Sequence, residues 1–250
     1  MKKHDSNYIN NIIQMVYIDH RLKKTNIPGK GYGFIARESI RAGDILIKET
    51  PSITIQENEI YSDIFQLLYL ILSDQQLKEQ FITLAPDSVD NISINQSNIM
   101  NELKKKVSSK NNALYDFFAN NYSTKEIMIY CAKYMCNAFE FQNKPVILFT
   151  GTMMNHSCLP NVIFGEKDNQ MCFIAVRDIK KGEEICGSYI DITLPTNKRK
   201  KHLKEQYGFD CRCERCSIQD DNMIKQLHKQ AIEIEKEKKK EFGHSKSKYV

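Results

Sequence analysis

The sequence predicts an α+β fold in which two separated β-rich segments share one core and a helical segment interrupts them. Three observations support this prediction. Short apolar runs bounded by glycine turns lie before residue 51 and again within residues 131–193. Between these segments, apolar residues recur at helical spacing. After residue 193, a basic helical stretch leads into three cysteines that lie within six residues.

The composition indicates one composite globular domain, with 250 residues of which 41% are apolar and 27% charged. The net charge of +5 and the isoelectric point of about 8.6 suit acidic or mixed partners without requiring nucleic acid. The first residues lack the apolar run of a signal peptide, and the longest apolar run, residues 64–72, is too short to cross a bilayer. We therefore expect a protein of the nucleus, the cytoplasm or both.

The N-terminal segment, residues 1–50, begins with apolar residues over 12–22 that fit either a strand or a short helix. Residues 28–36 hold three glycines, which let the backbone approach a ligand closely. Their spacing matches neither a P-loop nor a dinucleotide-binding motif, so a glycine-rich hairpin without a ligand explains the pattern equally well. The sequence pattern of residues 40–47 recurs at 179–185. We interpret the two segments as similar hairpin turns rather than duplicated domains.

In the insertion, residues 51–130, apolar residues recur at helical spacing, which predicts helices. An Asn- and Ser-rich loop is expected over 90–101. A further helix is predicted over 124–137, with Thr124 as its cap. Strands are expected at 146–150, 162–164, 171–176 and 184–190. The tail, 218–250, predicts a short amphipathic helix followed by a solvated charged end over 236–241.

Three thiols at the spacing C-x-C-x-x-C, those of Cys211, Cys213 and Cys216, point to a metal site. Three thiols cannot form disulfides without leaving one over, and no secretory signal suggests an oxidising compartment. Zinc takes four tetrahedral ligands, and closely spaced cysteines supply three of them at little cost in chain entropy. Spacing alone leaves three rivals for the fourth position: Cys158, Cys186 and His202. The remaining cysteines are expected to be inert core residues: Cys131, Cys136 and Cys172.

Four motifs follow one another in a specific order. They are residues 155–161 (N-H-S-C-x-P-N), 182–185 (G-E-E-I), 188–191 (S-Y-x-D) and 207–216 (Y-x-F-x-C-x-C-x-x-C). In this order they resemble the SET-domain protein lysine methyltransferases, above all the SET-and-MYND (SMYD-like) branch. The resemblance covers about residues 20–50 and 130–217. No cysteine precedes Cys131, so the MYND zinc finger typical of that branch is lacking.

The resemblance implies a SET-domain fold of several small sheets with a pseudoknot, in which one segment passes through another. It divides the chain into two halves of the SET core (1–50 and 131–193), the helical insertion (51–130), a post-SET zinc segment (194–217) and the charged tail (218–250). It also implies that Cys158 is the fourth zinc ligand beside Cys211, Cys213 and Cys216. Zinc would then join the post-SET segment to the N-H-S-C stretch.

The implied reaction is methyl transfer from S-adenosylmethionine to a lysine side-chain amine. The resemblance places Tyr189 at the transfer point, where its hydroxyl orients the amine, and Phe139 and Tyr207 in an aromatic substrate channel. The implied cofactor-binding residues come from distant segments: Lys30, Gly31, Tyr32, Asn137, Asn155, His156, Tyr189 and Phe209. Relatives usually carry arginine and asparagine where Lys30 and Tyr32 stand, so backbone contacts from this loop are expected more than side-chain contacts.

The sequence thus predicts a monomeric, zinc-containing protein lysine N-methyltransferase that acts on a histone tail, as a chromatin regulator, or on another lysine-containing peptide. The alternative is a catalytically inactive SET scaffold that binds peptides or protein partners; the presence of Tyr189, Asn155 and His156 disfavours it. A nucleic-acid binder would use the basic runs 198–204 and 236–240, which lack interleaved aromatic residues. Neither membrane association nor direct nucleic-acid binding is expected.

Overall fold

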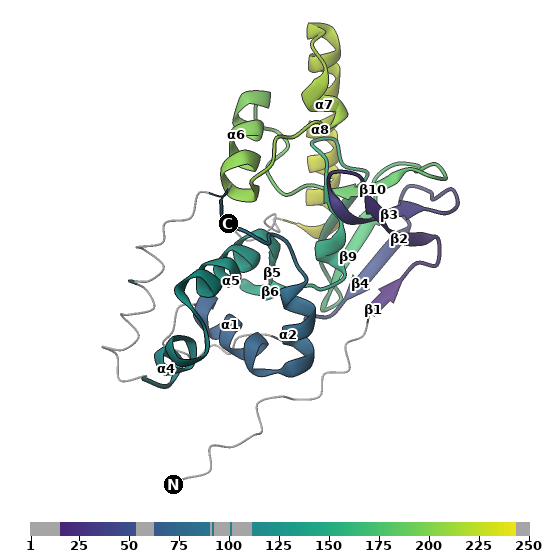
Figure 1. The fold of residues 1–250 in the computed structure, drawn as a ribbon. Coiled ribbons are helices and arrows are strands. Elements are labelled where there is room, and N and C mark those ends of the chain that lie inside the picture. Colours follow the sequence, from purple (N-terminus) through teal and green to yellow (C-terminus); the bar gives the residue numbers. More distant parts are fainter. Residues whose placement is uncertain (1–15, 54–62, 91, 93–100, 102–111, 244–250) are drawn as a thin grey trace.

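The computed structural model describes residues 16–53, 63–90, 92, 101 and 112–243 (Figure 1). The strands in this part of the chain are β1 (Val16–Ile18), β2 (Leu22–Ile27), β3 (Gly31–Ala36), β4 (Ile45–Glu49), β5 (Ala138–Phe141), β6 (Lys144–Ile147), β7 (Asn155–His156), β8 (Val162–Lys167), β9 (Gln170–Ala175) and β10 (Glu184–Gly187). The helices are α1 (Asp63–Ser73), α2 (Gln75–Ile82), α4 (Asn112–Asn121), α5 (Thr124–Asn137), α6 (Thr196–Tyr207), α7 (Glu214–Ser217) and α8 (Asp221–Phe242), with a 3-10 turn, η1, at Gly151–Met153. Most of the loop expected over 90–101 lies outside the described residues.

Two of the sheets join strands from both sides of the helical insertion. Their strand orders are β1-β4-β9-β8 and β2-β3-β10-β7, and β5 pairs with β6 in a small third sheet. Strand β7 runs parallel to β10 and sets Asn155 beside Cys186 and His156 beside Gly187. The predicted α+β fold of several small sheets is therefore confirmed. The pseudoknot stays a prediction.

The two similar turns of the sequence meet in space. The backbone N–H of Ile40 donates to the carbonyl of Ile179 at 2.9 Å, and the N–H of Ile179 donates back to Ile40 at 2.9 Å. Gly43 and Gly182 close the turns with φ of 88° and 85°, which suits glycine because it has no Cβ. The sequence pattern that recurs at 40–47 and 179–185 thus forms two turns, which pair with each other through Ile40 and Ile179.

Strand β10 ends at Gly187, three residues before the end expected from the sequence. The reason is a local turn in which the Ser188 hydroxyl donates to the carbonyl of Ile190 at 2.8 Å and accepts from its N–H at 3.3 Å. Strand β6 likewise ends at Ile147, because the chain then turns into η1. The early end of β10 matters for function, since it turns Tyr189 out of the ladder.

The helices α1, α2, α4 and α5 gather beside the sheets and enclose an apolar core of their own (Figure 1). Helix α5 begins as expected, but its cap is Ser123 and not Thr124. The Ser123 hydroxyl accepts from the N–H of Glu126, whose carboxylate in turn accepts from the N–H of Ser123 at 2.8 Å. This capping box satisfies two backbone donors at once, which Thr124 could not do one residue later.

The tail differs from its prediction. Helix α8 does not stop before the charged stretch but continues through it to Phe242, and Lys238 within that stretch is buried. The physical reason is a four-residue repeat of Ile234, Lys238 and Phe242, which places all three on the side of α8 that faces β8. In the described part of the chain, no helix is both long enough and apolar enough to cross a membrane.

Candidate active site and metal centre

A cleft of about 1350 Å³ brings together segments that are far apart in the sequence. Most of the residues with predicted roles line it: Lys30, Gly31, Tyr32, Asn137, Asn155, His156, Tyr189, Tyr207 and Phe209. The predicted site residues Phe139, Cys158 and Cys216 do not line the cleft. Cys211 and Cys213 of the predicted metal set lie on its wall.

Glu184 connects the glycine loop to the N-H-S-C stretch. Its carboxylate accepts from Lys30 Nζ at 2.6 Å and from Asn155 Nδ2 at 3.0 Å. Burial disfavours the charge on Lys30, but the hydrogen bond to Glu184 and the nearby negative charges together outweigh it and raise the pKa of the amine. A Cβ on Gly33 would stand 2.6 Å from Asn155 Nδ2, so only glycine allows this close approach. Sequence reasoning missed Glu184, although the G-E-E-I motif contains it.

Asn137 organises the rim of the cleft through its side chain. Its Nδ2 donates to the carbonyls of Ala85 and Lys133 at 2.6 and 2.7 Å, and its Oδ1 accepts from the Thr152 hydroxyl. The buried Lys133 contacts the carbonyl of Leu84 and lies 3.2 Å from Asp87. These bonds hold residues 83–87, which line the cleft. This contribution of the insertion was not predicted, because nothing local to residues 83–87 indicates a ligand.

His156 lies between the cleft and the cysteines. Its Nδ1 accepts a hydrogen bond from the backbone N–H of Tyr189 at 3.0 Å, so in the neutral ring the proton is on Nε2. Nε2 lies 3.2 Å from the sulfur of Cys158 and can donate to it. The imidazole therefore links the position of Tyr189 to the cysteine cluster, a role beyond the cofactor contact that the resemblance implied.

Three aromatic rings follow His156 along the cleft. The Tyr189 hydroxyl donates to the carbonyl of Met154 at 2.9 Å, and the Tyr207 hydroxyl donates to the carbonyl of Tyr189 at 3.2 Å. The two tyrosine rings lie 5.0 Å apart, and Phe209 lies 6.5 Å from Tyr207. Burial raises the pKa of both tyrosines, so each hydroxyl keeps its proton at neutral pH and acts through hydrogen bonds.

Phe139 belongs to the apolar core beside the cleft. It is 1% exposed and packs edge-on against Phe164, with ring centres 5.3 Å apart. Met154, whose carbonyl accepts from Tyr189, is a member of the same core cluster. The predicted channel residues thus lie on two sides: Tyr207 lines the cleft, and Phe139 lies in the core that contains Met154.

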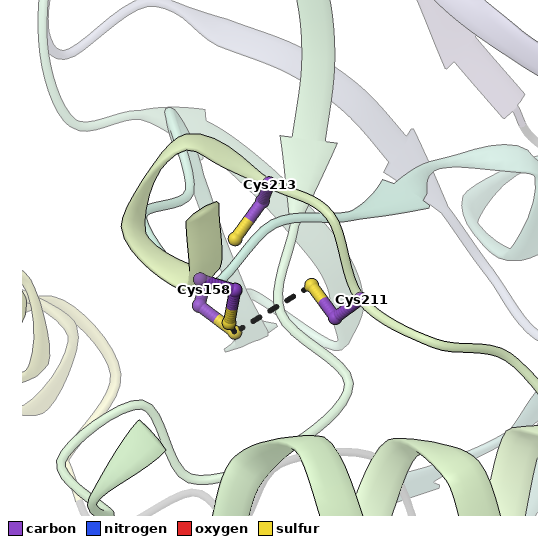
Figure 2. Close-up of side chains that lie close together, drawn as sticks. Cys158, Cys211 and Cys213 are labelled. Atoms are coloured by element: carbon purple, nitrogen blue, oxygen red, sulfur yellow. Dashed lines mark hydrogen bonds between the residues drawn. The ribbon is translucent and has the colours of Figure 1, made fainter. Parts of the chain in front are cut away.

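The four predicted metal ligands meet in one cluster. The sulfurs of Cys158, Cys211, Cys213 and Cys216 all lie within 4.8 Å of one another. Figure 2 shows three of these side chains pointing toward a common centre. The sulfur of Cys158 lies 4.0 Å from the sulfur of Cys211 and 3.5 Å from that of Cys216. Zinc–sulfur bonds of about 2.3 Å in a tetrahedron place sulfurs ~3.8 Å apart, so this set fits zinc. The rivals Cys186 and His202 are not part of the cluster.

Two buried arginines stand around the cysteines. Arg215 Nη1 donates to the carbonyls of Cys158 and Ile192 at 3.0 and 2.6 Å. Arg199 Nη2 lies 3.8 Å from the sulfur of Cys216. Hydrogen bonding with Cys211 and the other two sulfurs raises the pKa of the Cys158 thiol, so the set opposes full ionisation by itself. A zinc ion held by four thiolates would keep a net negative charge, which the guanidinium groups of Arg199 and Arg215 would offset.

The remaining cysteines divide between core and cleft. Cys131 and Cys172 are buried in apolar clusters, and burial raises the pKa of Cys131 to about 12, as expected for inert thiols. Cys136 is also buried, but it lines the cleft and its sulfur contacts the carbonyl of Gln206 at 3.4 Å. It is therefore a wall residue and not simply part of the core.

Comparisons with known proteins agree on one family. A family model described as SET domain matches residues 31–190. A putative SET domain-containing protein of Acanthamoeba polyphaga mimivirus is 45% identical over 212 residues, which are 84% of this chain and 83% of that protein. The human N-lysine methyltransferase SMYD2 is 29% identical over 186 residues, which are 70% of this chain. The chain spans only 43% of the length of SMYD2.

Solved structures share the fold at low sequence identity. The SET domain of LSMT bound to lysine and AdoHcy has a TM-score of 0.58 and 16% identity, over 78% of this chain and 54% of that one. Rubisco LSMT bound to AdoMet has a TM-score of 0.53 and 15% identity, over 77% and 52% of the two chains.

Proposed function

The chain belongs to the SET-domain family, and on this premise we propose that it transfers a methyl group from S-adenosylmethionine to a lysine side chain of a protein substrate. Two facts support this activity: SMYD2 is named as an N-lysine methyltransferase, and LSMT is described with lysine and AdoHcy bound. The observation that carries the proposal is the Tyr189 hydroxyl, which is protonated, bonded to the carbonyl of Met154 and part of the cleft wall.

The donor, when bound, supplies an electrophilic methyl group on a positively charged sulfur. The cleft offers three kinds of group to hold it: the backbone around Gly31, the amide of Asn155, and the ring of Phe209. Lys30 is engaged with Glu184, so we assign it the role of shaping the loop. The side chain of Tyr32 is exposed, and its backbone carbonyl accepts a hydrogen bond from Asn155 Nδ2 at 3.5 Å.

The acceptor must be a neutral amine. A free lysine has a pKa near 10.4, so its neutral form costs roughly 4 to 5 kcal/mol at pH 7 unless the site lowers the pKa. Apolar walls lower it, because burial disfavours the charged form. We propose that Tyr189 and the carbonyl of Met154 orient the amine and that Phe139 and Tyr207 flank it. In-line alignment of nitrogen, methyl carbon and sulfur then supplies most of the rate.

Zinc has a structural role in this proposal. Joining Cys158 to the three later cysteines fixes the segment that carries Tyr207 and Phe209. That segment then lies against His156, whose ring centre is 6.2 Å from that of Phe209. Metal binding would therefore stabilise the cleft as well as the tail.

The acceptor protein is proposed to be a histone tail or another lysine-containing peptide, bound by a monomer in the nucleus or cytoplasm. The mild positive charge of the chain does not restrict this choice. Action on histones would make the protein a chromatin regulator.

Two measurements test the proposal. Calorimetry should detect binding of S-adenosylmethionine to the zinc-loaded protein, and labelled donor should transfer its methyl group to lysines of histones or a cell extract. Tight donor binding with no transfer to either acceptor would support the inactive scaffold instead. Salt-sensitive binding to random DNA without donor binding would favour a nucleic-acid binder.

A further inference from the structure

Helix α8 packs against β8, an edge strand of the sheet β1-β4-β9-β8. Ile234 and Phe242 pack on the apolar cluster that contains Ile163. The fit is close, because a Cβ on Gly165 would stand 2.5 Å from the ring of Phe242. An ion pair between Lys167 and Glu241 adds a contact near the end of α8. The tail is therefore docked on the SET core.

Lys238 is the unusual residue of this interface. It is 9% exposed, and its Nζ lies over the ring of Phe164, 5.0 Å from the ring centre. Among the described residues, no hydrogen bond or ion pair holds this amine. Burial lowers its pKa, while the nearby charges of Glu235 and Asp191 act in the opposite direction. Lys238 is thus a desolvated amine on an aromatic face.

Phe164 connects Lys238 to the proposed transfer point. Its ring packs against Phe139 at 5.3 Å and comes within 3.4 Å of the position a Cβ would take on Gly187. The same position on Gly187 lies 3.4 Å from the sulfur of Met154, the residue that accepts the Tyr189 hydrogen bond. Neither Phe164 nor Lys238 lines the cleft. The ring of Phe164 therefore lies between Lys238 and the core residues Phe139 and Met154, outside the residues that line the cleft.

We propose that Lys238 is an internal acceptor, which the protein methylates on its own chain. The proposal rests on the proposed function, because the donor is the same S-adenosylmethionine. The amine of Lys238 lies over Phe164, which packs on Phe139, and the four-carbon stem of Lys238 lets this amine move from Phe164 toward Tyr189. In the reaction, the neutral nitrogen attacks the methyl carbon, a carbon–nitrogen bond forms as the carbon–sulfur bond breaks, and the new ammonium can release its extra proton to water.

Methylation would not undo the docking. A methylated amine that is protonated keeps its positive charge, so it can return to the face of Phe164 and retain the cation-π contact. The added methyl groups increase apolar contact with the ring. We therefore expect the modified tail to remain docked on β8.

The experiment incubates the full, zinc-loaded chain with labelled S-adenosylmethionine in the presence of histones, and peptide mass spectrometry locates the label. We expect label on Lys238 and at least about 10-fold less on the exposed Lys236, Lys239 and Lys240 of the same helix, because only Lys238 is held near the transfer point. The rate per molecule should not change with protein concentration, since the acceptor is in the same chain.

Two matched variants complete the test. Lys238→Arg keeps a cation over Phe164 but should remove the label from α8, whereas Lys240→Arg should leave it unchanged. Labelled histones with an unmodified Lys238 would overturn this inference and leave the proposed function standing. Label that rises with protein concentration or falls mainly on exposed lysines would also overturn it. If neither histones nor Lys238 are labelled although the donor is present, the proposed function fails as well.

Discussion

The two sides of the proposed transfer point are built differently. The cleft side is polar and open, with Glu184, Lys30 and Asn155 in one hydrogen-bonded group. The opposite side is apolar, with Phe139, Phe164 and Phe173 packed against one another in the buried core. A donor with charges and hydrogen-bonding groups needs several polar partners, whereas the methylene stem of a lysine needs only apolar walls. The difference suggests separate binding of donor and acceptor.

The largest expected effect comes from the cysteine cluster, which should serve the cleft side. We expect Cys211→Ala to lose its zinc and to bind S-adenosylmethionine at least about 100-fold more weakly, because metal binding fixes the segment that carries Phe209. Elemental analysis and calorimetry measure the two effects. Cys172→Ala is the matched control, since Cys172 is buried beneath α8 and outside the cluster. Normal donor affinity in zinc-free Cys211→Ala would contradict the role given to the metal.

The next effect should fall on the transfer and not on donor binding. Tyr189→Phe removes the hydroxyl that donates to Met154 and should slow methyl transfer by about 100-fold, since misplacing a reactant is costly. Calorimetry should find the donor affinity within about twofold of the wild type, because the ring remains. Tyr17→Phe, at an exposed tyrosine, serves as the control. Equal loss of binding and transfer would mean that Tyr189 belongs to the donor side alone.

Two glycines allow a direct comparison of the sides. A Cβ on Gly33 would displace Asn155, and a Cβ on Gly165 would displace Phe242. Gly33→Ala should therefore weaken donor binding by about 10-fold, roughly the value of a lost hydrogen bond, while leaving α8 docked. Gly165→Ala should instead increase hydrogen exchange in α8 without changing donor affinity. A change of donor affinity in Gly165→Ala would show that the two sides are coupled.

The smallest effect should come from a carboxylate remote from both sides. Hydrogen bonds from the Arg21 side chain outweigh burial and hold the pKa of Asp19 at about 2. The folded pKa lies below the unfolded value near 3.9, so this stabilisation is present above about pH 4 and is lost as the pH falls toward 2. Asp19→Asn should therefore lower the free energy of unfolding by about 1 kcal/mol at pH 7, after screening near the surface, and by less at pH 3.

Urea denaturation at the two pH values measures this effect. Donor affinity at pH 7 should be unchanged in Asp19→Asn, because Asp19 does not line the cleft. A loss of stability that is the same at pH 7 and pH 3 would mean that the Arg21 contact does not depend on the charge of Asp19.

The amino-acid sequence alone determined the α+β fold of several small sheets and the groups that can do the chemistry. The sequence predicts three metal ligands, Cys211, Cys213 and Cys216, because metal binding needs fixed ligand types at short spacing. The assignments of Cys158 and Tyr189 depended on the order of motifs. Each of these residues lies in a short local pattern, which can be recognised without knowledge of the tertiary structure.

Only the tertiary structure shows which residues that are far apart in the sequence contact one another. Glu184 and Lys30 are 154 positions apart, and the burial of Lys238 follows from docking on Phe164 and not from its own charged surroundings in the sequence. No local periodicity encodes such contacts, because they arise from the pairing of strands and the packing of helices across the chain. A charged run that is expected to be solvated can thus supply a buried amine that lies over a core aromatic ring.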